Sequence, residues 1–407
     1  MIDSSIGYGE QLRSRADALA TACVHAGEPP GADGGLDPPI VMSSAFAFES
    51  AEHAARAFRG EEDAWIYGRW GNPTVAALET KLAAIEGAEA ACATASGMAA
   101  ISGAVMAVCE SGDHIVAPRS MYAESARLFR DRLPKLGITT TFVEATAEAY
   151  AAAMTPRTRI LYVETPSNPT LGVIDIAAIA ALARSTAPRV VVVVDGTFAT
   201  PFAQTPLAHG ADLVVHSMTK GISGHGDVIA GVVAGGAELV NKVRDTVIKG
   251  FGGVLSPLSA WLVARGLRTF HVRQERACAT AATLAAHLAA HPRVARVFHP
   301  SLSTHPGHAL AQRQMFAYGT LLSFEIAADG ADAVLRGRTV LESLRVATHA
   351  VSLGDVRTLV VHPASTTHST MPAEARRLAG IGDGLLRVSC GLEGTADLLA
   401  DFDRALG

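Results

Sequence analysis

The sequence predicts an α/β protein, with a mainly parallel, doubly wound sheet in a large unit and a smaller α+β unit after it. The first observation is that short apolar runs alternate with helical stretches through the middle of the chain, as strand–helix–strand crossovers of a parallel sheet require. The second is a change of pattern from about residue 293 onward, where short strands and helices mix without that rhythm.

The strands are expected where apolar runs are short and continuous. Residues 190–194 are five consecutive valines, and 213–215 read Leu-Val-Val. Such runs are typical of strands that are covered on both faces. The expected strands are 114–117, 159–164, 190–195, 213–216 and 229–234 in the large sheet, and 319–326 and 385–389 in the smaller unit.

Helices are expected where apolar residues recur at helical spacing. In the stretch 75–86, Leu78, Leu82 and Ile85 form a core-facing stripe, and Thr74 is the expected N-cap. The other expected helices are one from Ser96 through Met106, 126–133, 176–185, and one long stretch that runs past Trp261 to about His291.

The chain is expected to divide into three parts. Residues 1–64 carry Gly and Pro clusters, cannot easily build a core, and are expected to lie as an arm on another surface, such as a neighbouring subunit. Residues 65–270 form the large unit and 271–407 the α+β unit.

Composition excludes several classes of protein. Of 407 residues, 49% are hydrophobic and 18% charged, and the net charge of −5 comes without a basic patch, so neither DNA nor RNA is an expected partner. No apolar run is long enough for a membrane span, and the N-terminus lacks a secretory pattern, so we expect a cytoplasmic protein with no membrane contact. Five scattered cysteines without CxxC spacing predict neither disulfides nor a metal site.

One lysine follows the strand expected at 213–216. A lysine delivered by a buried strand is paired, desolvated or covalently used, and the alternative is a solvated lysine at a loop corner. Functional groups of a doubly wound sheet gather at the carboxyl ends of its strands. Glu164, Asp195 and the 217–220 segment with Lys220 all stand at such ends.

Asp195, directly after the five valines, restricts the kinds of cofactor that the site would suit. A buried carboxylate there must be hydrogen-bonded or charge-paired, and capping of the next loop is the alternative. Together, Lys220 and Asp195 match pyridoxal 5'-phosphate (PLP), whose aldehyde bonds to a lysine amine and whose pyridinium nitrogen is kept protonated by a carboxylate. PLP is therefore the expected cofactor.

A PLP phosphate needs donors, and the start of the helix after Ser96 offers them. Ser96-Gly97-Met98 leaves backbone N–H groups free at a helix N-terminus, and Ser217 and Thr219 add hydroxyls. Small residues at a helix start also serve close packing, so this signal is weak when taken alone.

Motifs along most of the chain carry a family resemblance. They include Glu-Thr-Pro-Ser-Asn-Pro at 164–169 and Ser-Gly-His-Gly-Asp at 223–227. With them the chain resembles the Cys/Met-metabolism PLP enzymes of fold type I, which comprise cystathionine and methionine γ-lyases, cystathionine synthases and O-acetylhomoserine sulfhydrylases. The matching segments, in family order, are 67–74, 95–98, 164–169, 193–197, 212–220, 223–227, 350–355, 362–365 and 387–393.

The resemblance implies three catalytic residues and a larger cofactor site in the 65–270 unit. Lys220 would carry the cofactor and move protons, Asp195 would hold its ring nitrogen, and Tyr122 would stack on the ring and act as acid or base at the γ-leaving group. The implied cofactor-binding residues are Tyr67, Arg69, Ser96, Gly97, Met98, Tyr122, Asn168, Asp195, Thr197, Ser217, Thr219 and Lys220. Tyr67 and Arg69 would come from the adjacent subunit, which implies a homotetramer of two active dimers.

For the substrate, the resemblance implies that Arg387 binds the α-carboxylate and that Ser352 orients the lysine or that carboxylate. Two positions depart from the family. Gly196 replaces the usual Asn, which suggests a freer loop. Glu124 stands where methionine γ-lyases carry a cysteine, and it either selects a cationic or hydrogen-bond-donating substrate or turns outward at a helix start.

The function implied by the resemblance is γ-elimination on an amino acid with a γ-leaving group, which gives 2-oxobutanoate, ammonia and the released group, as in methionine γ-lyase. The alternative is a γ-replacement transferase of the O-acetylhomoserine sulfhydrylase or cystathionine γ-synthase type. A PLP-binding protein without turnover is the third hypothesis.

Overall fold

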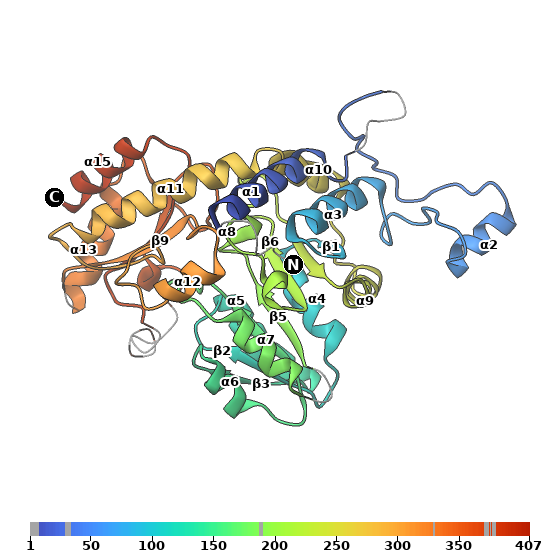
Figure 1. The fold of residues 1–407 in the computed structure, drawn as a ribbon, viewed down its shortest axis with the longest axis horizontal. Helices are drawn as coiled ribbons and strands as arrows, with labels where there is room; N and C mark the ends of the chain where they lie inside the picture. Colours follow the sequence, from blue (N-terminus) through green and yellow to red (C-terminus); the bar gives the residue numbers. More distant parts are fainter. Residues whose placement is uncertain are drawn as a thin grey trace.

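Figure 1 shows the computed structural model of the chain, which describes residues 8–28, 34–186, 190–328, 330–369, 374, 376 and 380–407, with the side chains of 8–14 and 331 left out. Two sheets organise it, one in the centre and one toward the C-terminal end. None of the helices in this described part combines the length and apolar character that a bilayer crossing requires.

The central sheet has seven strands in the order β1-β7-β6-β5-β4-β2-β3. Only β7 runs against its neighbours, so the prediction of a mainly parallel sheet is confirmed. Two of its strands, β1 and β3, were not predicted. The strands are β1 (Ala90–Thr94), β2 (His114–Pro118), β3 (Thr139–Val143), β4 (Thr158–Glu164), β5 (Val191–Asp195), β6 (Leu213–Ser217) and β7 (Gly231–Gly235).

Helices cover both faces of this sheet. On β5, Val193 packs into the core shared with α4, whereas Val192 and Val194 pack with α6 and α7 on the opposite face. This alternation explains why the strand is valine throughout. The elements around the sheet are α3 (Pro73–Glu86), α4 (Gly97–Val108), α5 (Ala123–Arg127), η1 (Leu128–Arg132), η2 (Leu133–Leu136), α6 (Ala147–Ala153), α7 (Ile176–Arg184), α8 (Thr200–Ala203), η3 (Pro206–His209), α9 (Ala237–Val243), η4 (Arg244–Gly250) and α10 (Pro257–Leu267).

The start of α3 differs from the prediction. Asn72, not Thr74, is the N-cap, because its side chain accepts from the N–H groups of Thr74 and Val75 while Pro73 occupies the first turn. The Thr74 hydroxyl instead accepts from the N–H of Val41 at 2.9 Å. The predicted stripe of Leu78, Leu82 and Ile85 is buried, as expected.

A second sheet of five strands, in the order β10-β11-β12-β9-β8, forms the core of the C-terminal part. Phe324 of β9 and Phe402 of α15 meet in this core with ring centroids 6.0 Å apart. Its elements are α11 (Phe270–Ala289), β8 (Val294–Phe298), α12 (His308–Gln314), β9 (Leu321–Ile326), α13 (Gly330–Ser343), β10 (Thr348–His349), β11 (Leu359–Val361), η5 (Pro363–Ser365), β12 (Leu385–Ser389) and α15 (Thr395–Leu406).

The long helix expected to run to about His291 is two helices. α10 ends at Leu267 and α11 begins at Phe270. Between them the N–H of Thr269 turns back to the carbonyl of Gly266, a tighter turn than an α-helix makes. Because helical periodicity is present on both sides of the two-residue break, the sequence pattern does not reveal the break.

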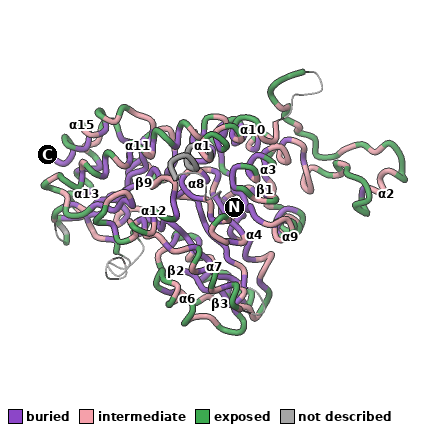
Figure 2. Tube along the Cα trace, viewed as in Figure 1, coloured by how far each residue is buried: buried purple, intermediate pink, exposed green. Residues whose placement is uncertain are grey.

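The two segments of the N-terminal part are placed differently. Helix α1 (Tyr8–His25) packs on the body, next to α3 and α11, whereas the segment that carries α2 (Ala51–Arg59) extends away from it (Figure 1). Most of this extended segment is exposed or half-buried (Figure 2). Leu36, Met42 and Phe58 are 82%, 65% and 61% exposed, so the described residues of this chain leave them uncovered.

Candidate active site

The carboxyl ends of β4, β5 and β6, the start of α4 and segments of the C-terminal part enclose one cavity of about 550 Å³. All the predicted site residues except Tyr67 and Arg69 line it. The residues that do so are Ser96, Gly97, Met98, Tyr122, Glu124, Asn168, Asp195, Thr197, Ser217, Thr219, Lys220, Ser352 and Arg387.

Tyr67 and Arg69 lie away from this cavity. Tyr67 pairs by its backbone with Ala45 and is 43% exposed, and the guanidinium of Arg69 donates to the carbonyl of Lys249. Within its own chain, therefore, neither residue reaches the cavity.

Lys220 follows β6 in the loop that returns to the antiparallel β7. Its Nζ donates to Ser352 Oγ at 2.8 Å. Burial, and then the charge of Arg387, lower the pKa of this amine. The environment thus favours the neutral, nucleophilic form, as the chemistry expected of Lys220 requires.

Asp195 ends β5 and is 7% exposed. One oxygen accepts from the N–H of Thr197 at 3.0 Å, and the other accepts from the hydroxyl of Tyr162 at 3.3 Å. Burial raises the pKa of Asp195, and its hydrogen bonds to Thr197 oppose that rise. A cation placed beside this carboxylate stabilises its ionised form.

Arg387, on β12, is the buried cation of the cavity, 5% exposed. Its Nη1 donates to Asn168 Oδ1 at 3.0 Å and its Nη2 to the carbonyl of Ser352 at 2.9 Å, while its Nε has no partner in the described structure. Burial lowers the pKa of Arg387 to about 10. A desolvated guanidinium that donates to neutral oxygens is suited to an incoming carboxylate.

The start of α4 packs directly on the end of β6. A Cβ on Gly97 would lie 2.7 Å from Ser217 Cβ, so only glycine fits there. The Ser96 hydroxyl caps the helix by accepting from the N–H of Ala99. The other N–H groups of the first turn have no acceptor within the helix, which makes this end suited to an anion.

A chain of hydrogen bonds connects the residues on the two sides of the cavity. Lys220 donates to the hydroxyl of Ser352, and the backbone carbonyl of Ser352 accepts from Arg387. Arg387 also donates to the side-chain oxygen of Asn168. Beyond Asn168 the chain of hydrogen bonds continues to Glu164, which also accepts from the N–H of Tyr122.

The loop that carries Ser352 is held tightly against Lys220. Ser352 has a φ of 127°, which a residue other than glycine seldom adopts. A Cβ on Gly354 would lie 2.3 Å from the backbone N of Gly221. The contact between these two loops therefore requires glycine and fixes the position of Ser352.

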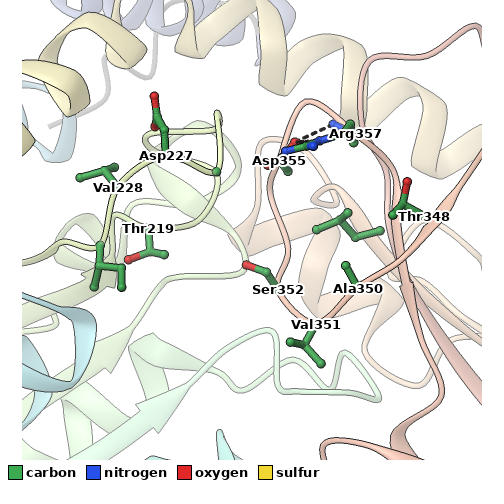
Figure 3. A pocket seen from close by; sticks show the side chains of 12 residues that line it. Thr219, Asp227, Val228, Thr348, Ala350, Val351, Ser352, Asp355 and Arg357 are labelled. Carbon is green, nitrogen blue, oxygen red and sulfur yellow. Dashed lines mark hydrogen bonds and ion pairs between the residues drawn. The ribbon is translucent and has the colours of Figure 1, made fainter.

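Beside the cavity lies a second hollow of about 480 Å³, which shares Thr219, Ile229, Val351 and Ser352 with it. Figure 3 shows the 219–228 loop on one side of this hollow and the 348–357 segment on the other. At its rim Ile229 and Val351 are 67% and 63% exposed. These two exposed apolar side chains are suited to contact with another chain.

Residues 20–407 match the sequence family described as Cys/Met metabolism PLP-dependent enzyme. The chain belongs to this family. It is 45% identical to an L-methionine gamma-lyase of Fusobacterium nucleatum over 97% of this chain and 99% of that protein. It is 40% identical to an O-succinylhomoserine sulfhydrylase of Pseudomonas aeruginosa over 96% and 95%.

A solved structure shows the same fold. The crystal structure of metB from Corynebacterium glutamicum aligns with a TM-score of 0.88 at 36% identity, over 95% of this chain and 97% of that one. The chain is thus a PLP-dependent enzyme of fold type I, as the motifs predicted.

The cavity of this Cys/Met-metabolism enzyme fits PLP. A lysine with a lowered pKa, a buried carboxylate and the open N-terminus of α4 line one space, together with Ser217. These are an amine for the aldehyde, an anion for the ring nitrogen and donors for the phosphate. The Thr219 hydroxyl is not a free donor for the phosphate, because it already forms hydrogen bonds with the backbone of Ala230.

Nine of the residues that line the cavity were not predicted as site residues, among them Glu164, Phe198 and His368. Glu164 was recognised as a strand-end carboxylate without a role, although its place at the end of an expected strand, like that of Asp195, was a signal in the sequence. Burial and the charge of Asp195 raise the pKa of Glu164 to about 8. Phe198 and His368 also line the cavity, and nothing in their local sequence indicated it.

Gly196, for which the sequence suggested a freer loop, is held in place. Its N–H donates to the carbonyl of Val215 at 3.1 Å, and its carbonyl accepts from the N–H of Thr200. A Cβ there would lie 2.7 Å from His216 Cε1. The position is therefore glycine because the ring of His216 occupies the space of a side chain.

Arg387→Met tests the anion site. We expect KM for an amino-acid substrate to rise about 10- to 100-fold, since a hydrogen bond to a charged group contributes about 1.5–3 kcal/mol. Removing the cation also allows the pKa of Lys220 to rise. The rate at which the apoenzyme recombines with PLP should therefore begin to fall at a higher pH when the pH is lowered. The control is Arg313→Met, because Arg313 is exposed on α12 and its guanidinium bonds only the carbonyl of Ala309 in the same helix among the described hydrogen bonds. An unchanged KM in Arg387→Met contradicts the assignment.

Proposed function

We propose that the enzyme catalyses γ-elimination on an amino acid with a γ-leaving group and releases 2-oxobutanoate, ammonia and that group. One observation carries the proposal: Lys220, Arg387 and the phenol of Tyr122 line the same cavity. The relatives named L-methionine gamma-lyase, at 41–45% identity in the first five matches, support it.

Each proposed role follows from the chemistry of the side chain. PLP, when bound, supplies an electron sink for negative charge on the substrate carbons. The neutral Nζ of Lys220 removes and returns protons at the substrate, Arg387 binds the α-carboxylate, and Asp195 keeps the ring nitrogen cationic. Asn168 would hold the ring oxygen, while Thr197 supports Asp195 and accepts from the N–H of Ser217.

Tyr122 is the proposed acid at the leaving group. It stands directly before α5 and is 43% exposed. Burial, and then the charges of Glu124, Glu164 and Asp195, raise its pKa. Its phenol therefore keeps its proton at neutral pH and is suited to donate that proton to a departing thiolate.

The phosphate site is proposed to be completed by a second subunit. Ser96, Gly97, Met98 and Ser217 would supply donors from the same chain, whereas Thr219 lines the site with its hydroxyl bonded to Ala230. Tyr67 and Arg69 would reach in from a neighbour, because they do not line their own cavity. The exposed apolar residues of the arm 1–64 and of the second hollow support such a contact, within a homotetramer of two active dimers. The cytoplasmic location stays a prediction.

The proposed substrate preference depends on Glu124. Its side chain is 55% exposed and lies 3.9 Å from Arg127, while it also lines the cavity. A carboxylate there favours a γ-group that carries hydrogen-bond donors, and a side chain turned outward has no such effect.

Gamma-replacement is the second candidate function, because the relatives of Pseudomonas aeruginosa and Mycobacterium tuberculosis are named O-succinylhomoserine sulfhydrylase. The third hypothesis, binding without turnover, loses its support, because the family and its named relatives are enzymes.

A substrate panel separates elimination from replacement. Purified enzyme is incubated with methionine, homocysteine, cystathionine, canavanine or O-acetylhomoserine, with and without sulfide, and keto acid, ammonia and amino-acid products are measured. We expect methionine to give 2-oxobutanoate, ammonia and methanethiol in equal amounts without an added nucleophile. A new amino acid that forms only with sulfide, without keto acid, contradicts the proposal.

The same panel with Glu124→Gln tests the substrate preference. A fall in the ratio of canavanine to methionine turnover supports a role for Glu124 at the γ-group, and an unchanged ratio shows that the side chain faces solvent.

Mixed oligomers test the shared site. Arg69→Ala and Lys220→Ala are each expected to lose activity. Co-expression places an intact Lys220 opposite an intact Arg69 in half of the sites of each mixed dimer, so the random mixture should regain about a quarter of wild-type activity. Two Lys220→Ala chains co-expressed under different tags are the control. A mixture that contains both chains in one particle yet stays inactive rules out the shared site.

A further inference from the structure

Glu164 is a buried carboxylate to which the proposed mechanism gives no role. It is the last residue of β4, 4% exposed, and stands beside Asp195 in the register of β4 and β5. Neither of its oxygens pairs with a cation in the described structure. Instead, Oε2 accepts from the N–H of Tyr122 at 2.7 Å and Oε1 accepts from the N–H of Asn168 at 3.3 Å.

The first of these bonds fixes the residue proposed as the acid. Tyr122 lies between β2 and α5, and its side chain provides no cap for that helix. Glu164 is 42 positions away in sequence, so this bond is a tertiary one. It holds the backbone of Tyr122, which lines the cavity.

The second bond fixes the other end of the substrate site. Asn168 lies in the loop after β4, and its side-chain oxygen accepts from Nη1 of Arg387. Through Asn168, Glu164 therefore supports the guanidinium that would bind the α-carboxylate. One carboxylate thus connects the group at the γ-end of the substrate with the group at its carboxylate end.

This arrangement has an energetic cost that a neutral side chain avoids. Glu164 and Asp195 are two buried carboxylates on neighbouring strands, and like charges in that position repel each other. Consistent with this, burial and Asp195 raise the pKa of Glu164. A buried titratable group with a raised pKa that also bonds two site residues is typical of a functional position.

We propose that Glu164 is a positioning residue that holds the phenol of Tyr122 and, through Asn168, the guanidinium of Arg387 at the spacing that a γ-substituted amino acid requires. The proposal rests on the proposed γ-elimination, in which Tyr122 protonates the leaving group.

The leaving group itself provides the test. A thiolate from methionine needs a proton as it departs, whereas a carboxylate from O-acetylhomoserine is stable without one. A variant with a misplaced phenol therefore loses turnover of methionine more than elimination of O-acetylhomoserine. Loss of overall fold or of cofactor lowers both alike.

Glu164→Gln is the main variant, since glutamine keeps one acceptor oxygen and places an NH₂ group against the second backbone N–H. We expect kcat for methionine to fall by about 100-fold, in the range of general acid catalysis, with at least about a tenfold smaller fall for O-acetylhomoserine. Glu144→Gln is the control, because the Glu144 side chain is 79% exposed. If Glu164→Gln does not fold, Glu164→Asp, which shortens the side chain and keeps both oxygens, should show the same asymmetry.

Hydrogen–deuterium exchange of the apoprotein gives a second readout that does not depend on turnover. We expect faster exchange in Glu164→Gln in the two peptides that contain the amides of Tyr122 and Asn168, and no change in Glu144→Gln. Equal losses with the two substrates, or unchanged exchange in both peptides, overturn the proposal. Wild-type enzyme that forms no keto acid overturns the γ-elimination instead, and the exchange result then decides the role of Glu164.

Discussion

A guanidinium buried beside a lysine is the constraint on which the rest of the site depends. Arg387 donates to neutral oxygens of Asn168 and Ser352 and forms no ion pair within the described structure. Burying a cation without a counter-ion is costly, so the site is completed by an anion from solution. The α-carboxylate of the proposed amino-acid substrate would supply that charge. Burial, and then the charge of Arg387, lower the pKa of Lys220, so the charge proposed to anchor the substrate also acts on the amine.

The parallel sheet explains why these groups meet. Glu164 and Asp195 are paired residues at the ends of β4 and β5, and β6 ends beside them at Ser217. The antiparallel return of β7 keeps the 218–230 connection short, so Lys220 stays at this edge instead of leaving on a crossover helix. The C-terminal sheet then contributes Arg387 from β12. Chemistry at this edge therefore requires both sheets.

The sequence allowed the prediction of those features that depend on local pattern. The strands that carry Glu164, Asp195 and Ser217 are apolar runs, and each was expected within a few residues of its observed bounds. The cap of α3 was wrongly assigned to Thr74 because two adjacent hydrogen-bonding residues flank Pro73 and only the backbone geometry distinguishes them. Phe198 and His368 were missed because they reach the cavity through tertiary packing alone. Arg69 lies outside the cavity of its own chain, where its guanidinium donates to the carbonyl of Lys249, a tertiary contact that no local pattern indicates.

Lys220, in the cavity at the end of β6, is the residue to which the cofactor is expected to be joined. Borohydride reduction of the protein as purified with PLP, followed by proteolysis and peptide mass mapping, tests this directly. We expect the reduced cofactor on the peptide that contains Lys220 and on no other lysine. A modified peptide elsewhere, with Lys220 recovered unmodified, contradicts the account.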